Sequence, residues 1–153
     1  CLDWEPPARP VRRPREFSTL RPICQIRLRY SESHRMGAVY NSRVLEWLEC
    51  GRNELLRQLG TPYAEMEARG VMLPLIEAHV EYTGPATYDD LLNVATAVTM
   101  AGRARVRFDA EITHAADGAA VARGHTVHAV VDTDRRPIRP PDWLVQLLER
   151  GNA

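Results

Sequence analysis

The chain has 153 residues, enough for one domain with its own hydrophobic core, because domains most often contain roughly 100–150 residues. Hydrophobic residues make up 44% and charged residues 26%, which are ordinary values for globular proteins and argue against a fibrous or wholly disordered chain. Lys plus Arg and Asp plus Glu number 20 each, and this balance argues against a binder of nucleic-acid backbones, which favours a basic excess.

The first segment, residues 1–22, holds four prolines between Pro6 and Pro14, with several arginines among them and no strand or helix periodicity. This composition is typical of a flexible arm. We therefore expect a flexible Pro/Arg-rich arm over residues 1–22, followed by one folded domain over residues 23–150. Because no apolar run approaches the roughly 18 residues of a membrane span, and the start shows no signal-peptide pattern, we expect a cytoplasmic protein.

Two periodicities follow the arm. Residues 23–30 alternate between apolar and polar side chains, which predicts a strand with one wet face. From Val44 to Leu59 apolar residues recur at spacings of three, four and seven, which predicts a helix with caps available at Asn41 and Ser42. A short second helix is predicted from Pro62 through Ala68.

The second half of the chain reads as strands. Four stretches rich in Val and Thr are separated by the turn signals Gly84-Pro85, Ala101-Gly102 and Asp117-Gly118, and they cover residues 75–82, 91–101, 103–114 and 119–132. They predict about four strands connected as an antiparallel meander, followed by a short amphipathic helix over residues 141–148. The resulting fold class is α+β, with a five-stranded antiparallel sheet wrapping the long helix.

The numbers and spacings of cysteine and histidine in the sequence give little support for a disulfide framework or a metal site. The three cysteines, Cys1, Cys24 and Cys50, are odd in number and contain no Cys-x-x-Cys pair, so we expect Cys24 and Cys50 to be small core residues. His125 and His128 are three apart in a predicted strand and therefore fall on opposite faces. We expect no metal.

Residues 29–41, Arg-Tyr-Ser-Glu-Ser-His-Arg-Met-Gly-Ala-Val-Tyr-Asn, and the helix over residues 45–56 resemble the 4-hydroxybenzoyl-CoA thioesterase-like branch of hot-dog-fold acyl-CoA thioesterases, which includes the Tol-Pal-associated enzymes. Further matching pieces are residues 70–74, Tyr82, 85–86, 88–90, 124–128 and 136–141. The resemblance implies a hot-dog fold, a homodimer or a homotetramer formed as a dimer of dimers, and an acyl-CoA or acyl-carrier thioester as substrate. It implies no cofactor beyond the coenzyme A that is part of the substrate.

The same resemblance implies how the thioester is activated. In the family, the N-terminus of the central helix polarises the thioester carbonyl, because its free N–H groups and its dipole favour developing negative charge. This role maps to the backbone amide of Asn41, and Gly37 allows the turn before it. We expect Gly37, Val39, Tyr40 and Arg43 to contact substrate, Arg43 through an acidic acyl group or the CoA phosphates unless it pairs with Glu46 or Glu32 instead.

The group that activates water departs from the family pattern. His34 stands where the family carries its catalytic aspartate, and Asn41 stands where the family carries a histidine. An imidazole with an ordinary pKa near ~6.5 can accept a proton from water at neutral pH, so His34 is a chemically credible general base. Glu32 in the turn or Glu49 on the helix could instead supply a carboxylate. His34 could also be a polar loop residue in a site that only binds.

Two functions therefore compete with thioester hydrolysis. The first is a hydrolysis-deficient protein that binds acyl thioesters and keeps the fold and the dimer. The second is a 3-hydroxyacyl dehydratase, which would pair His34 with Glu46 or Glu49. The Pro-Gly-rich segment that such dehydratases carry between the histidine and the acidic residue is absent here, which argues against the second alternative.

Overall fold

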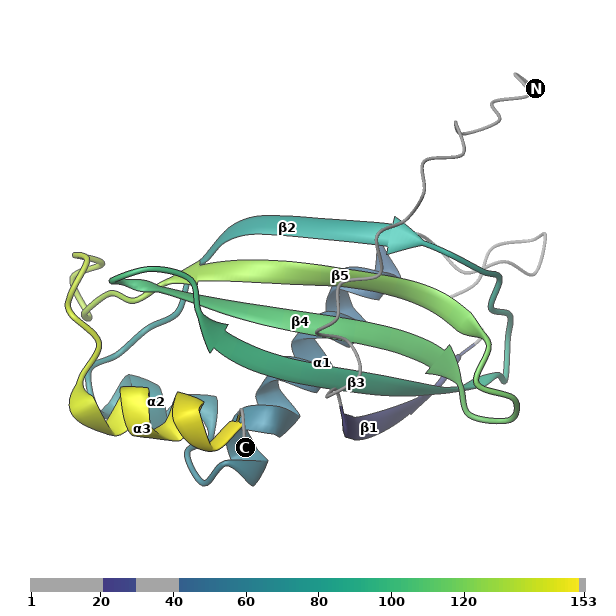
Figure 1. The fold of residues 1–153 in the computed structure, drawn as a ribbon, viewed down its shortest axis with the longest axis horizontal. Helices are drawn as coiled ribbons and strands as arrows, with labels where there is room; N and C mark the ends of the chain where they lie inside the picture. The colour runs from purple at the N-terminus through teal and green to yellow at the C-terminus, as the bar shows by residue number, and fades with distance from the viewer. Residues whose placement is uncertain (1–20, 30–41, 152–153) are drawn as a thin grey trace, which may run out of the picture.

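The computed structural model describes residues 21–29 and 42–151 of the chain. In this part, one strand is followed by two helices, four strands and a final helix (Figure 1). The bounds are β1 Arg21–Arg27, α1 Arg43–Gln58, α2 Tyr63–Ala68, β2 Leu75–Tyr82, β3 Leu91–Met100, β4 Arg105–His114, β5 Ala120–Ala129 and α3 Asp142–Gly151. None of the helices in these two ranges is long and apolar enough to cross a membrane.

Most element bounds agree with the sequence prediction to within a few residues. The strand β1 begins at Arg21, so its first two residues fall in the segment predicted to be an arm. The strand β5 ends at Ala129 rather than Asp132, because the backbone beyond it finds other partners. The amide of Val130 donates to the carbonyl of Ala104 at 2.9 Å, and Val131 exchanges hydrogen bonds with Met72.

The five strands form one antiparallel sheet with the order β1-β3-β4-β5-β2. The prediction of an α+β fold, in which a five-stranded antiparallel sheet wraps a long helix, is confirmed. The predicted four-strand meander is wrong at one place. Strands β3, β4 and β5 form a meander, but β2 lies at the outer edge beside β5 and does not pair with β3.

The segment between β2 and β3 explains why Gly84-Pro85 makes no hairpin. The amides of Thr83 and Gly84 both donate to the carbonyl of Val121 at the start of β5, at 2.9 and 3.1 Å. Five residues after Gly84, the pair Asp89–Asp90 exchanges hydrogen bonds of 3.0 and 2.9 Å with Leu28 beside the end of β1. The connection therefore runs across the end of the sheet, from one edge to the far side.

The helix α1 lies against one face of the sheet and divides the core into two clusters. Its first half packs with the ends of β1, β3, β4 and β5, through buried residues such as Trp47, Leu92 and Ile112. Its second half packs with α2, α3 and the other end of the sheet, through residues such as Leu56 and Leu144. The predicted C-terminal helix is confirmed as α3, which buries Leu144, Leu147 and Leu148.

The helix approaches the sheet closely at Gly51. A Cβ atom at this position would come within 2.5 Å of the Thr96 Oγ1 atom and 2.7 Å of the Val94 Cγ1 atom, both on β3. A larger residue would have to displace these two side chains, so the close approach of α1 to the sheet depends on glycine at this position.

The two cysteines that the structure describes differ in burial. Cys24 is half-buried and packs against the core cluster beneath the first half of α1. Cys50 is exposed, which makes its prediction as a core residue wrong. The residues of α1 that face the sheet are its neighbours Trp47, Leu48 and Gly51, and successive helical residues are rotated by about 100°. Cys50 therefore falls on the side of the helix rather than beneath it.

The contact at Gly51 yields a test of this packing. Changing Gly51→Ala adds a methyl group that must displace Thr96 or Val94, and overpacking of this kind costs about 1–3 kcal/mol. We expect the free energy of unfolding, measured in urea, to fall by that amount even though alanine favours helices over glycine. The neighbouring exposed change Cys50→Ala is the control and should move the value by less than about 0.5 kcal/mol. A Gly51→Ala protein as stable as the wild type would contradict the close approach.

Candidate active site

The start of α1 is the part of the described fold that best suits a polarised carbonyl. Ser42 occupies the N-cap position, but its side chain makes no capping hydrogen bond. The first N–H groups of the helix therefore receive no partner from this side chain, and together with the helix dipole they favour a negative oxygen. Beneath them, Val44 and Trp47 are buried against the ends of the strands, which fixes the helix start on the sheet.

Most of the residues that the sequence predicted for the site lie outside the described ranges. These are Glu32, His34, Gly37, Val39, Tyr40 and Asn41, so their predicted roles stay predictions. The structure places the other two, Arg43 and Glu49, in the first two turns of α1. The two residues are six positions apart on a helix of 3.6 residues per turn, so their side chains leave α1 in different directions.

Arg43 pairs with Glu46 on the same helix. Its Nη1 atom lies 2.9 Å from Oε2 and 3.1 Å from Oε1 of that carboxylate, so the guanidinium contacts both oxygens. One of the two pairings weighed from the sequence is therefore present. The pair also engages the Glu46 carboxylate, which makes Glu46 a poorer candidate than Glu49 for the acid of a dehydratase.

Glu49 lies on the flank of α1 that carries Leu45 and Arg52. The three positions follow the i, i+4, i+7 spacing of one helical stripe, and Glu49 is exposed. This flank faces the β4–β5 side, because the Arg52 guanidinium lies over the ring of Phe108 in β4, with 5.8 Å between its Cζ atom and the ring centroid. We call Leu45, Glu49 and Arg52 the outer stripe of α1.

Beyond the Phe108 ring that Arg52 covers lies His128, a buried histidine that the sequence analysis did not select as a site residue. Burial lowers the pKa of Arg52, while the charge of Glu49 opposes that shift, so these two residues are electrostatic neighbours. Phe108 contacts His128 edge to face, with ring centroids 5.3 Å apart. The sequence did not indicate a role for Arg52, because a single arginine on a helix is normally a solvent-exposed residue.

His128 is only 1% exposed and both of its ring nitrogens are bonded. Nδ1 lies 2.9 Å from the carbonyl of Leu73 and Nε2 lies 3.0 Å from Oγ1 of Thr126. A carbonyl can only accept, so Nδ1 carries the proton and Nε2 accepts from the threonine hydroxyl. Burial lowers the pKa of His128 to about 4, with the Leu73 hydrogen bond opposing and the charge of Arg52 reinforcing that shift. The imidazole is therefore neutral at pH 7.

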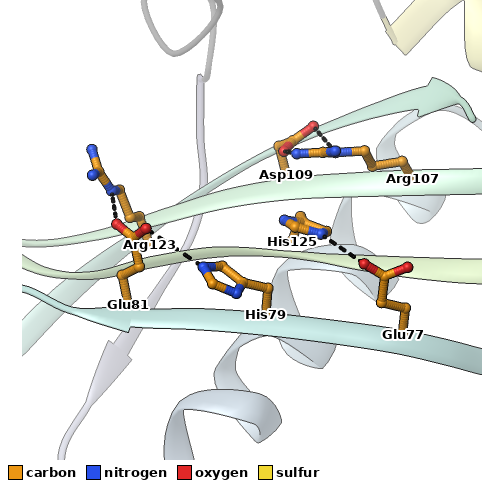
Figure 2. A network of polar contacts seen from close by, with 7 residues as sticks. All are labelled: Glu77, His79, Glu81, Arg107, Asp109, Arg123 and His125. Carbon is orange, nitrogen blue, oxygen red and sulfur yellow. Dashed lines mark hydrogen bonds and ion pairs between the residues drawn. The ribbon is translucent and has the colours of Figure 1, made fainter. Parts of the chain in front are cut away.

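The opposite face of the sheet carries a network of polar contacts between acidic side chains and arginine or histidine side chains (Figure 2). It joins Arg123 to Glu81 at 2.7 Å, Arg107 to Asp109 at 3.0 Å, His79 to Glu81 at 3.5 Å and His125 to Glu77 at 3.6 Å. The hydrogen bond from Arg123 holds the pKa of Glu81 below its usual value. His125 belongs to this face and His128 to the core, so the predicted placement of the two histidines on opposite faces is confirmed.

Comparison with known families matches nearly all of the described fold. A family model described as the thioesterase-like superfamily matches residues 28–148. This range contains α1, the outer stripe and four of the five strands in full.

Two relatives of known sequence have names that refer to CoA thioesters. YneP of Bacillus subtilis (strain 168), named as a candidate acyl-CoA thioesterase, is 38% identical over 72 residues. That match covers 47% of this chain and 52% of YneP, so it spans about half of the relative's length. A 1,4-dihydroxy-2-naphthoyl-CoA hydrolase of Synechococcus elongatus is 26% identical over 124 residues, which cover 76% of this chain and 90% of the hydrolase.

A solved structure shares the architecture over most of its length. The DHNA-CoA thioesterase from Staphylococcus aureus is 29% identical to this chain and superposes with a TM-score of 0.73. The superposition covers 85% of this chain and 93% of the other.

The buried His128 yields a prediction on stability. The unfolded chain protonates this imidazole near pH 6.5, whereas the folded chain protonates it only near pH 4. The stability that the neutral His128 contributes is therefore fully present above about pH 6.5 and is lost as the pH falls towards 4. The loss amounts to at most ~3 kcal/mol.

Urea unfolding measured from pH 7 to pH 4 checks this expectation. The His128→Gln protein is less stable at every pH, because it loses buried hydrogen bonds, but its stability should depend less on pH across this window. The exposed change Gln58→Ala removes no titratable group, so it is the control and should keep the wild-type slope. Parallel pH profiles for wild type and His128→Gln would refute the assignment.

Proposed function

The chain belongs to the thioesterase-like superfamily and has its hot-dog fold, and from this membership we propose that it is an acyl-CoA thioesterase. The observation that carries the proposal is the family match over residues 28–148, which includes the helix start and its supporting core. Three proteins that are similar to this chain have names that refer to thioesterases or hydrolases of CoA thioesters. An acyl group on a carrier protein would present the same thioester to the site.

The proposed reaction is the addition of water to the thioester carbonyl carbon. The carbon–sulfur bond breaks, the acyl group leaves as a carboxylic acid, and the proton lost by water ends on the departing thiol. The N-terminus of α1 is proposed to stabilise the carbonyl oxygen as it becomes negative, through the dipole of the helix and through the backbone amide of Asn41, the residue before the N-cap Ser42. Gly37, Val39 and Tyr40, which precede α1 in the sequence, are proposed to contact the substrate.

His34 is proposed as the general base that takes the proton from water. It is the residue of this chain that stands where the resembling enzymes carry their carboxylate. Glu49 is the second candidate, because it is exposed on the outer stripe and its charge acts on Arg52. Glu32 is the third. Arg43 forms an ion pair with Glu46 through its Nη1 atom. Any contact of Arg43 with substrate is therefore proposed to use N–H groups of the guanidinium that do not point at Glu46.

The function is proposed to operate in a homodimer formed through β2. This strand is the outer edge of the sheet, so one side of its backbone meets no other strand of the described fold. Large apolar side chains are exposed along it, Leu75 by 54%, Ile76 by 48% and Tyr82 by 52%. Leu45 on the outer stripe is 44% exposed. Pairing two copies at this edge would cover these groups and bring the outer stripe of α1 to the interface.

The thioesterase proposal is tested with an assay of thiol release from acyl-CoAs with short, long and aromatic acyl groups. We expect His34→Ala to lower kcat by about 10²–10⁴, the usual contribution of general-base catalysis. Glu49→Ala reports on the second candidate, and Glu54→Ala is a matched control. Glu54 belongs to the same helix but pairs with Arg57, so its removal should leave turnover close to wild type.

A hydrolysis-deficient binder is the second candidate function, and the replacement of the usual aspartate by His34 favours it. In that case the wild-type protein would bind acyl-CoA without releasing thiol, and His34→Asp would gain turnover. Equal rates for wild type, His34→Ala and Glu49→Ala would contradict both proposed bases.

The dimer is tested by light scattering during size-exclusion chromatography. Ile76→Lys places a charge at the exposed edge of β2, so we expect it to shift the protein from dimer to monomer. Met100→Lys is the control, because Met100 is also an exposed apolar residue but ends β3 rather than lying on β2. A wild-type monomer, or a dimer unaffected by Ile76→Lys, would contradict the interface.

A further inference from the structure

Cys50 lies on the flank of α1 opposite to the outer stripe. This flank faces β1, because the Nε2 atom of Gln58 donates to the carbonyl of Ile23 at 3.2 Å. Gln58, Glu54 and Cys50 are each four residues apart, so they form one line along the helix. Cys50 therefore looks towards the β1 edge of the sheet and away from the β2 edge.

The side chain of Cys24 lies on the face of β1 that is turned towards this flank of the helix. It is paired in register with Val94, whose side chain is fully buried beneath α1, so Cys24 points to the helix side of the sheet. It packs against the core cluster that contains Trp47 and Leu48. The contact of Gly51 with Val94 brings this stretch of α1 unusually close to the sheet, and Cys50 is the neighbour of Gly51.

The electrostatics agree with this placement. Burial raises the pKa of the Cys24 thiol above its ordinary value, and the charges of Cys50 and Glu54 raise it further. The two thiols are therefore within electrostatic range of each other. They differ in access, since Cys50 is exposed and Cys24 is half-buried. Cys50 is therefore the more accessible of the two thiols to reagents from solution.

We propose that Cys50 and Cys24 form a reversible thiol pair that takes a small-molecule disulfide as its co-reactant. The Cys50 thiolate attacks one sulfur of the small disulfide, which breaks the sulfur–sulfur bond and releases one small thiol. The Cys24 thiolate then attacks the sulfur of Cys50, releases the second small thiol and closes the Cys24–Cys50 bond. The two protein thiols lose two electrons and two protons, and the small disulfide is reduced to two thiols.

The closed bond would tie α1 to the edge strand β1 and enclose residues 24–50 in a covalent loop. This loop includes His34 and Asn41, two of the residues predicted for the active site. The proposal does not rest on the proposed function, because bond formation is read from mass and stability rather than from turnover.

The experiment treats the full chain with oxidised glutathione, blocks remaining thiols and maps the cross-link by peptide mass spectrometry. We expect a Cys24–Cys50 peptide and the loss of two hydrogens from the chain, both reversed by a reducing agent. A loop of this size should raise Tm by about 5–10 °C in the oxidised protein. The second step needs the Cys24 thiolate, so its rate should rise about tenfold for each pH unit below the pKa of Cys24.

Single variants separate the two steps. Cys24→Ser should stop at a stable glutathione adduct on Cys50, whereas Cys50→Ser should leave Cys24 largely unmodified. Cys1→Ser is the control for the third cysteine and should still form the link. A full chain that keeps its glutathione adduct on Cys50, or that links either residue to Cys1 instead, would overturn the proposal.

Discussion

The contact between Gly51 and strand β3 sets the position of the central helix, and the rest of the molecule is arranged around that helix. Without a side chain at this point, α1 lies against Thr96 and Val94. Its first half packs against the end of the sheet that lies beside the helix N-terminus, and its second half packs with α2 and α3. One close approach thus orients both ends of α1, including the N-terminus that is proposed to polarise the thioester.

Because the orientation of α1 is fixed, its two flanks carry different functional groups. The outer stripe faces the side of β4 and β5, where Arg52 lies over Phe108, Phe108 contacts the neutral His128, and Glu49 is exposed. The opposite flank faces β1 and carries Cys50. Catalysis in a dimer and thiol exchange at an edge strand can therefore be tested separately, because the residues concerned lie on different sides of α1.

Local pattern predicted the elements well because hydrophobic periodicity is a local property, and β2 was found with the bounds that its sequence predicts. The sheet order was missed because alternation says which face of a strand is buried but not which strand lies beside it. The exposure of Cys50 and the role of Arg52 depend on the rotation of α1 about its axis, which Gly51 fixes through residues over forty positions away. The sequence also singled out residues 32–41, and these predictions await experiment.

The most direct test of the central claim, that this chain hydrolyses thioesters, is to follow free thiol and the acyl product together in water labelled with heavy oxygen. Saturated and 2-enoyl CoA esters would both be tested as substrates of this chain. We expect one thiol for each carboxylic acid formed, with one labelled oxygen in that acid. Labelled hydroxyacyl-CoA with the thioester intact would indicate a dehydratase, and bound acyl-CoA without any product would indicate a binding protein; either result would contradict the account.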